Sequence, residues 1–255
     1  MDFKKMMEAL QGANRMVVLT GAGVSTESDI PDFRTKGGVL EQHPEYMDDM
    51  TKGCLEGRPK AFWASYWKVF SPHEMVEKRP NTLHNLLASW EDDGKDVVIY
   101  TQNIDGLHQK AGSRQVKEVH GSVRQLVCPK CKTYSDVKTY AEGEVPRCKN
   151  LRKQQPCGFI LHPDAVLFGH RVRHYKEMVA DVERADVLLV LGTSLNVTPV
   201  ADIMKDTEVA ALNRGQWRFY VSANPNREQD MYFEGVFPVT METFVAHLKN
   251  GGDVS

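Results

Sequence analysis

The sequence feature that most constrains the fold is a stretch near the N-terminus, Met16–Arg34, which reads MVVLTGAGVSTESDIPDFR. Its apolar start predicts a buried strand, and the small residues Thr20-Gly21-Ala22-Gly23 let the backbone turn tightly and approach a ligand. Ser25 and Thr26 place hydroxyls where a helix is expected to begin. A strand, a glycine turn and a helix N-terminus leave backbone N–H groups pointing outward, so together they predict an anion site suited to a pyrophosphate.

The glycine spacing alone leaves a second interpretation open, because an ordinary strand-to-helix turn also uses Gly-x-Gly. The third glycine of the dinucleotide fingerprint G-x-G-x-x-G is missing. The functional interpretation is favoured by Ile30-Pro31-Asp32-Phe33-Arg34, which puts a rigid proline, a carboxylate, an aromatic ring and a guanidinium just after the turn.

Length and charge limit the class of protein. The 255 residues suffice for one large domain with an insertion or for two small domains. Lys plus Arg number 32 against 34 for Asp plus Glu, so bulk charge does not indicate nucleic-acid binding. The sequence contains no run of 18 apolar residues, so no membrane helix is expected, and residues 1–14 lack the apolar core of a signal peptide. We therefore expect a cytoplasmic protein with reduced thiols and no membrane partner.

Further apolar runs predict a parallel sheet. Strands are expected at Asp96–Tyr100, Asp186–Leu191 and Arg218–Ser222, and helices at Asp2–Gln11 and Pro80–Trp90. Strands separated by helical segments are typical of an α/β fold with helices on both faces of the sheet. Ligands of such sheets bind beyond the carboxyl ends of the strands.

Polar or small residues follow each expected strand. The glycine turn follows the first strand, and the others are followed by Gln102, Asn103 and Asp105, by Gly192, Thr193 and Ser194, and by Asn224. Any one of these groups could occur simply because Asn, Gly and Ser favour turns. Four such ends together favour a dinucleotide site.

His120 and five cysteines carry the remaining chemical signals. His120 is followed directly by Gly121 and is a candidate general base, although a lone histidine is more often structural. Cys128, Cys131, Cys148 and Cys157 predict a structural tetrahedral Zn²⁺ site, because all four ligand positions come from protein. A redox pair or unrelated core cysteines are the alternatives. The long gap between the last two cysteines predicts an extended loop over Lys149–Pro156, and Cys54 is expected to be a plain thiol.

These motifs, in this order, resemble those of the sirtuins, which are NAD-dependent protein deacylases. The resemblance covers residues 15–224 and includes Val166-Leu167-Phe168-Gly169 and Gly192-Thr193-Ser194-Leu195. It implies an α/β fold with a Rossmann-like parallel sheet domain and a small domain made of a structural zinc module and a helical module. The implied division is 1–34, 72–125 and 163–255 for the NAD-binding domain, 35–71 for the helical module and 126–162 for the zinc module.

The resemblance also implies roles for individual residues. Gly21, Ala22, Gly23, Ser25 and Thr26 would hold the NAD pyrophosphate, and Gly192, Thr193 and Ser194 would serve the phosphates. Asp32, Phe33 and Arg34 would form a mobile cofactor loop. Gln102 and Asn103 would contact the nicotinamide ribose, Asp105 the nicotinamide carboxamide, and Asn224 the adenosine ribose. An acyl-lysine peptide would add as a strand between Val166, Phe168 and Gly169 on one side and Leu195 and Val197 on the other.

The implied reaction consumes NAD and moves no hydride. The acyl oxygen attacks the ribose carbon as nicotinamide leaves, and His120, with Asn103 as the second catalytic residue, then removes a proton from a ribose hydroxyl. The products are free lysine, nicotinamide and O-acyl-ADP-ribose. The alternatives are a sirtuin-fold protein ADP-ribosyltransferase and a non-catalytic NAD-binding sensor, and the presence of His120, Asn103 and Asp105 argues against the sensor.

The chain departs from the family pattern in three places. Asp29 stands where the family usually has Gly, His170 stands where it usually has Glu, and the gap between Cys148 and Cys157 is long. Asp tolerates a positive φ better than most residues. The Tyr-x-x-Arg pair of family members that prefer succinyl-lysine is also incomplete, because Tyr66 is followed by Val69 at the arginine position. Lys68 lies one residue away, about 100° around a helix, so we expect an apolar acyl pocket that favours acetyl over succinyl groups.

Overall fold

A computed structural model describes residues 3–31, 44–167, 171–196 and 198–250, and all structural statements concern these residues. The larger domain contains a parallel six-stranded sheet in the order β11-β10-β9-β1-β2-β3. Its strands are β1 (Arg15–Thr20), β2 (Asp96–Thr101), β3 (Val116–Glu118), β9 (Val187–Leu191), β10 (Trp217–Val221) and β11 (Gly235–Phe237). The expected parallel α/β sheet is therefore confirmed, with β3 and β11 as additional edge strands.

The order of the strands creates a switch point between β1 and β9. From β1 the chain proceeds through β2 to β3 on one side, and it returns to β9 on the other side before continuing to β11. Val17 pairs with Val98 of β2 and with Leu188 of β9, so β1 is central. The loops after β1 and β9 consequently diverge at the same edge, where open α/β sheets bind ligands.

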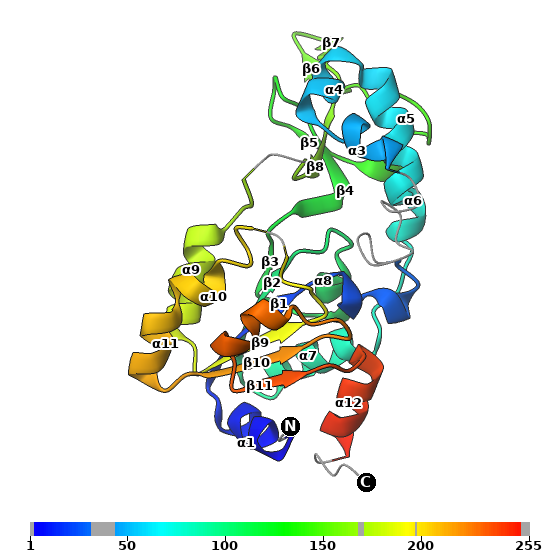
Figure 1. Ribbon diagram of the computed structural model, residues 1–255. Coiled ribbons are helices and arrows are strands. Elements are labelled where there is room, and N and C mark those ends of the chain that lie inside the picture. The colour runs from blue at the N-terminus through cyan, green and yellow to red at the C-terminus, as the bar shows by residue number, and fades with distance from the viewer. Residues whose placement is uncertain (1–2, 32–43, 168–170, 197, 251–255) are drawn as a thin grey trace.

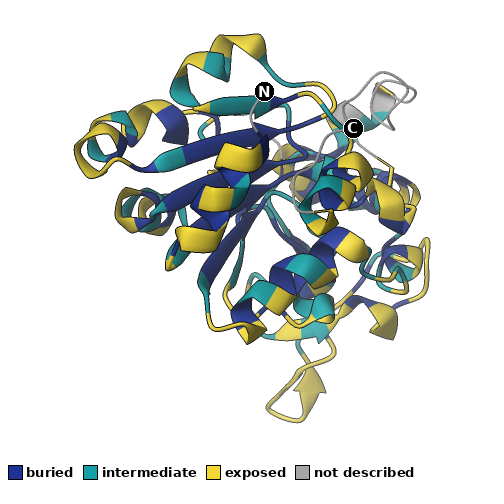
Figure 2. Cartoon of the chain, turned by 90° about the horizontal axis from the view of Figure 1, so that it is seen from below, coloured by how far each residue is buried: buried dark blue, intermediate teal, exposed yellow. Residues whose placement is uncertain are grey.

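Helices cover both faces of this sheet (Figures 1 and 2). Alternate strand residues pack on α1 (Phe3–Gly12), α7 (Thr82–Asp92) and α12 (Met241–Lys249) on one face. The other residues pack on α9 (Tyr175–Arg184) and α10 (Ile203–Asp206), which leads into α11 (Glu208–Arg214). Because the strands are buried on both faces, their sequences are continuous apolar runs rather than alternating ones.

The small domain lies above the carboxyl edge of the sheet (Figure 1). Its antiparallel sheet is β5-β4-β8, formed by β4 (Gly121–Val127), β5 (Tyr134–Asp136) and β8 (His162–Ala165). Helices α3 (Glu45–Asp49), α4 (Lys52–Gly57), α5 (Pro59–Phe70) and α6 (Pro72–Met75) share one core with this sheet. Phe62, Trp63 and Tyr66 of α5 are fully buried in that core, so these aromatics serve packing.

The helix expected to begin at Ser25 does not form, and that prediction was wrong. Two short 3₁₀ turns, η1 (Ala22–Val24) and η2 (Thr26–Ser28), occupy the stretch instead. Asp29 ends the second turn with φ 57° and ψ 34°, in the left-handed region. Pro31 follows two residues later and lacks an N–H, so neither residue favours helix continuation.

No helix in the described ranges is long and apolar enough to cross a membrane.

Candidate active site and metal centre

Two glycine loops interlock at the switch point. The Gly21 amide donates to Leu191 O (3.0 Å) and the Gly23 amide to Gly192 O (2.8 Å). A Cβ on Gly23 would lie 2.9 Å from Gly192 O, and one on Gly192 would lie 2.6 Å from the Val24 nitrogen. The glycines thus allow the two loops to contact each other. The sequence had indicated only that they let the backbone approach a ligand.

The same bonds determine which backbone donors remain for an anion. The Gly23, Val24 and Ser25 amides donate to Gly192 O, Gly21 O and Ala22 O. Among the amides of residues 21–25, that of Ala22 has no protein acceptor in the described part of the chain. The Ala22 amide is therefore the backbone donor in this stretch that remains for the predicted anion.

Gly192→Ala is expected to destabilise the fold by about 3 kcal/mol, because the new Cβ meets backbone atoms and Gly192 has φ +59°. Thermal or denaturant unfolding measures this effect. Gly12→Ala is the matched control, since a Cβ at Gly12 meets nothing within 4 Å. Equal stability of the two variants would show that the loops are not locked together.

A hydrogen-bond network joins the loops after β1, β2 and β9. Asn103 Nδ2 donates to Gly21 O (3.1 Å) and to Ser25 Oγ (3.0 Å), and Ser25 Oγ donates to Asp105 Oδ2 (2.8 Å). Gln102 Nε2 donates to Thr193 Oγ1 (3.0 Å). The structure thus brings together side chains that lie up to about 170 residues apart in the sequence.

Asp105 is held rigidly within this network. Its Oδ1 accepts a hydrogen bond from the Leu107 N–H (2.8 Å) at the start of α8 (Leu107–Ala111), and Asp105 is 6% exposed. Burial raises the pKa of the carboxyl, while the hydrogen bonds from Leu107 and Ser25 and the nearby Arg124 act in the opposite direction.

His120 precedes β4 at the edge of this network. Its Nδ1 lies 2.9 Å from Gln102 O. A carbonyl only accepts, so Nδ1 carries a hydrogen and donates it to Gln102 O; the neutral form of such a ring has its lone pair on Nε2. This tautomer is the one a general base acting through Nε2 requires.

Other predicted residues have more distant or undescribed positions. Val166 donates its N–H to His120 O (2.8 Å), and Leu195 is buried with φ 50° after the β9 turn. Thr26 Oγ1 donates to Gly23 O in the preceding 3₁₀ turn, Ser194 is half-buried, and Asn224 is exposed beyond β10. Predicted site residues outside the described ranges are Asp32, Phe33, Arg34, Phe168, Gly169 and Val197.

Two buried histidines beneath the glycine turn were not anticipated. His108 Nε2 lies 3.0 Å from Thr20 Oγ1, and the rings of His108 and His84 are 4.8 Å apart. Burial lowers the pKa of His84 to about 4, and burial, together with His84, lowers that of His108. Asn81, which caps α7, donates to Val24 O (2.7 Å). The asparagine before the helix was a readable capping signal, whereas the histidine contact arises only in the fold.

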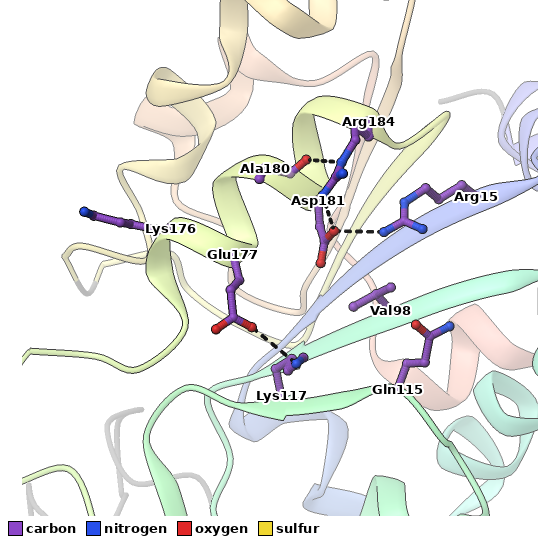
Figure 3. A pocket seen from close by; sticks show the side chains of 9 residues that line it. All are labelled: Arg15, Val98, Gln115, Lys117, Lys176, Glu177, Ala180, Asp181 and Arg184. Atoms are coloured by element: carbon purple, nitrogen blue, oxygen red, sulfur yellow. Dashed lines mark hydrogen bonds and ion pairs between the residues drawn. The ribbon is translucent and has the colours of Figure 1, made fainter.

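A cavity of about 510 Å³ lies elsewhere, between α9 and strands β1 to β3 (Figure 3). Asp181 accepts from Arg15 (2.8 Å) and from Arg184 (3.2 Å), and Lys117 pairs with Glu177 (3.2 Å). None of the predicted site residues lines it.

The four predicted metal ligands converge in the small domain. The sulfur atoms of Cys128, Cys131, Cys148 and Cys157 all lie within 4.8 Å of one another. The Cys128–Cys157 and Cys131–Cys148 sulfur distances are 3.8 Å and 3.5 Å, too long for disulfides. Four ligands at the Zn–S length of about 2.3 Å are about 3.8 Å apart, so the set fits tetrahedral Zn²⁺.

The segment between the last two cysteines forms a hairpin rather than an open loop. Strands β6 (Leu151–Arg152) and β7 (Gln155–Pro156) pair, and the Cys157 N–H donates to Asn150 O (2.8 Å). Hydrogen bonds from Thr133 lower the pKa of Cys131 to about 5, which favours the thiolate a metal needs. Cys54 is buried outside this cluster, as expected.

The fold and these sites define a class: a dinucleotide-binding α/β protein with a closed structural metal centre in its small domain. The Sir2 family model matches residues 21–199. An NAD-dependent protein deacetylase of Bacillus cereus (strain ATCC 10987) is 43% identical over 249 residues, covering 98% of each chain. That of Bacillus subtilis (strain 168) is 42% identical over 217 residues, covering 85% of this chain and 87% of the relative.

The fold of this chain is also similar to those of solved Sir2 structures. Sir2Tm bound to a propionylated peptide has a TM-score of 0.80 at 28% identity, covering 99% of each chain. A Sir2–p53 peptide–NAD⁺ complex has a TM-score of 0.78 at 29% identity, also covering 99% of each chain. The chain belongs to the Sir2 family, and the resemblance found in its sequence is confirmed.

Proposed function

We propose that this protein is an NAD-dependent protein-lysine deacylase that produces nicotinamide, O-acyl-ADP-ribose and free lysine. The observation that carries the proposal is the position of His120. Its ring is fixed by Gln102 O, and its own carbonyl accepts the N–H of Val166, the first residue of the predicted peptide strand. A base beside a peptide edge and a dinucleotide loop is the arrangement that deacylation needs.

NAD would be held where the loops after β1, β2 and β9 meet. NAD supplies the ribose carbon that accepts the acyl oxygen as nicotinamide departs. The Ala22 amide and Ser25 would bind the pyrophosphate with Gly21, Gly23 and Thr26 shaping the turn, and Asp105 would face the carboxamide. Gln102, Asn103, Thr193, Ser194 and Asn224 would hold the riboses and phosphates, and Gly192 would keep the two loops in contact.

His120 Nε2 would accept the proton of a ribose hydroxyl, so that this hydroxyl can attack the acyl carbon. The surrounding network positions the groups without proton exchange of its own, because Ser25 and Asn103 already donate within it. Backbone pairing to Val166 and Leu195 would bind the peptide with little sequence demand.

The surrounding organisation forms part of the same proposal. We place the NAD-binding domain at 1–34, 72–125 and 163–255, the helical module at 35–71 and the zinc module at 126–162. Zn²⁺ thiolates persist where thiols stay reduced, which supports a cytoplasmic location. Acyl-lysine proteins or peptides are the partners that the fold accommodates.

Mass analysis of an acetylated peptide incubated with NAD tests the function. We expect loss of the acetyl mass from the peptide and formation of O-acetyl-ADP-ribose. A peptide that instead gains the mass of ADP-ribose would establish the ADP-ribosyltransferase alternative. If the peptide shows neither change and NAD stays intact, the non-catalytic NAD-binding sensor is the remaining alternative.

Acetyl-lysine peptides should be turned over at least about 100-fold more efficiently than succinyl-lysine peptides, because a buried unpaired carboxylate is costly. Val69, at the arginine position, is 7% exposed, and Lys68 is on the exposed side of α5. Tyr66 is fully buried, and burial and Asp164 raise its pKa, so the phenol stays neutral.

The measurement is kcat/KM on two peptides that differ only in the acyl group. Lys68→Ala is the control and should leave the ratio unchanged. A ratio near one that Lys68→Ala leaves unchanged would show that the alignment of Val69 with the arginine position is wrong. A ratio that changes with Lys68→Ala would show that Lys68 reaches the pocket.

A further inference from the structure

The segment that follows β8 returns to the residues around His120 at both of its described ends. At its start, the Val166 N–H donates to His120 O (2.8 Å). At its end, the Arg173 N–H donates to Val119 O (2.9 Å). The carbonyls of two consecutive residues, Val119 and His120, therefore accept hydrogen bonds from Arg173 and Val166.

A side-chain ion pair joins Arg173 to Asp164, the residue two positions before Val166. Arg173 Nη2 donates to Asp164 Oδ1 (2.8 Å) and Nη1 donates to Asp164 Oδ2 (3.2 Å), so the pair is bidentate. Nη2 also donates to the Asp164 carbonyl (3.2 Å). The Asp164 side chain is 11% exposed and that of Arg173 39%. Bidentate arginine–carboxylate pairs fix geometry as well as adding energy.

Gly121 makes this close approach possible. It has φ +77°, and a Cβ there would lie 2.0 Å from Asp164 O and 3.1 Å from Arg173 Cζ. The residue directly after His120 thus packs against both partners of the ion pair. A shift of Arg173 would therefore displace the backbone next to His120, the candidate base.

We propose that the Asp164–Arg173 pair is a positioning element that holds Val166 against His120 and so determines affinity for the acyl-lysine peptide rather than for NAD. The inference rests on the proposed function, because that function assigns the peptide to Val166. Neither residue touches a reacting atom. Both act through the Val166–His120 contact.

The test compares Arg173→Gln, Arg173→Lys and the control Arg171→Gln. Arg171 is exposed and has no carboxylate partner in the described ranges. We expect Arg173→Gln to raise the peptide KM about tenfold while the KM for NAD and the zinc content stay unchanged. Arg173→Lys should recover part of the loss, because it keeps the charge but not the bidentate geometry. Arg171→Gln should match the unmodified protein.

Hydrogen exchange followed by mass spectrometry supplies a readout that needs no activity. Amides of residues 161–175 should exchange faster in Arg173→Gln than in Arg171→Gln. Unchanged kinetics and exchange in Arg173→Gln would overturn the proposal, as would an equal loss for peptide and NAD accompanied by lower stability. If the unmodified protein turns over no peptide, faster exchange would retain the ion pair's positioning role while the proposed function fails.

Discussion

His120→Ala is expected to lower the rate of deacylation by about 10²–10⁴-fold, the usual cost of losing a general base. The ring has a defined tautomer, because Gln102 O accepts from Nδ1 and leaves the lone pair on Nε2. Alanine removes the proton acceptor but leaves the His120 carbonyl, which still holds Val166. The effect should therefore appear in kcat more than in the peptide KM.

Steady-state kinetics with the acetylated peptide measure this loss. Exchange of labelled nicotinamide should persist in the variant, because the base acts only after nicotinamide has left. His247→Ala, in the last turn of α12, is the control and should turn over peptide normally. Zinc content and unfolding temperature should be unchanged, and near-normal turnover by His120→Ala would remove His120 from the mechanism.

Cys131→Ala should lose both the bound metal and the stability of the small domain. Structural Zn²⁺ contributes about 10–16 kcal/mol of apparent binding free energy in small zinc domains, and that energy is coupled to folding. The four sulfur atoms lie within 4.8 Å of one another, so without the cation their thiolates would repel. Cys128 and Cys148 are buried in the core shared by β4 and α5, so the disruption should spread into the helices.

Elemental analysis and thermal unfolding test this prediction. The unmodified protein should contain one Zn²⁺ per chain, and a strong chelator should reproduce the Cys131→Ala phenotype. Cys54→Ala is the matched control, because Cys54 is buried in the same core but lies outside the cluster. A metal-free protein that stays stable and active would contradict the zinc assignment, and a disulfide within the cluster would favour the redox alternative.

The sequence by itself determined the local elements and the chemical types at the strand ends. Continuous apolar runs identified the central strands β1, β2, β9 and β10 to within a residue or two, because a strand buried on both faces needs no polar positions. The edge strands β3 and β11 are three residues each and carry too short a pattern to detect. The cysteine spacing was sufficient to predict the metal site, since a Cys-x2-Cys pair followed by two further cysteines is typical of zinc sites.

Only the tertiary structure decided how these parts meet. The switch point packs Gly23 against Gly192 across about 170 residues of sequence, which assigns the Gly23 amide to the protein instead of to a ligand. Two 3₁₀ turns, ended by the left-handed Asp29, stand where a helix was expected to begin. His84 beside His108, and Arg173 on Asp164, are likewise contacts between separate elements. Sequence patterns record local propensity and burial, whereas such pairings depend on the register and order of strands, which no single segment encodes.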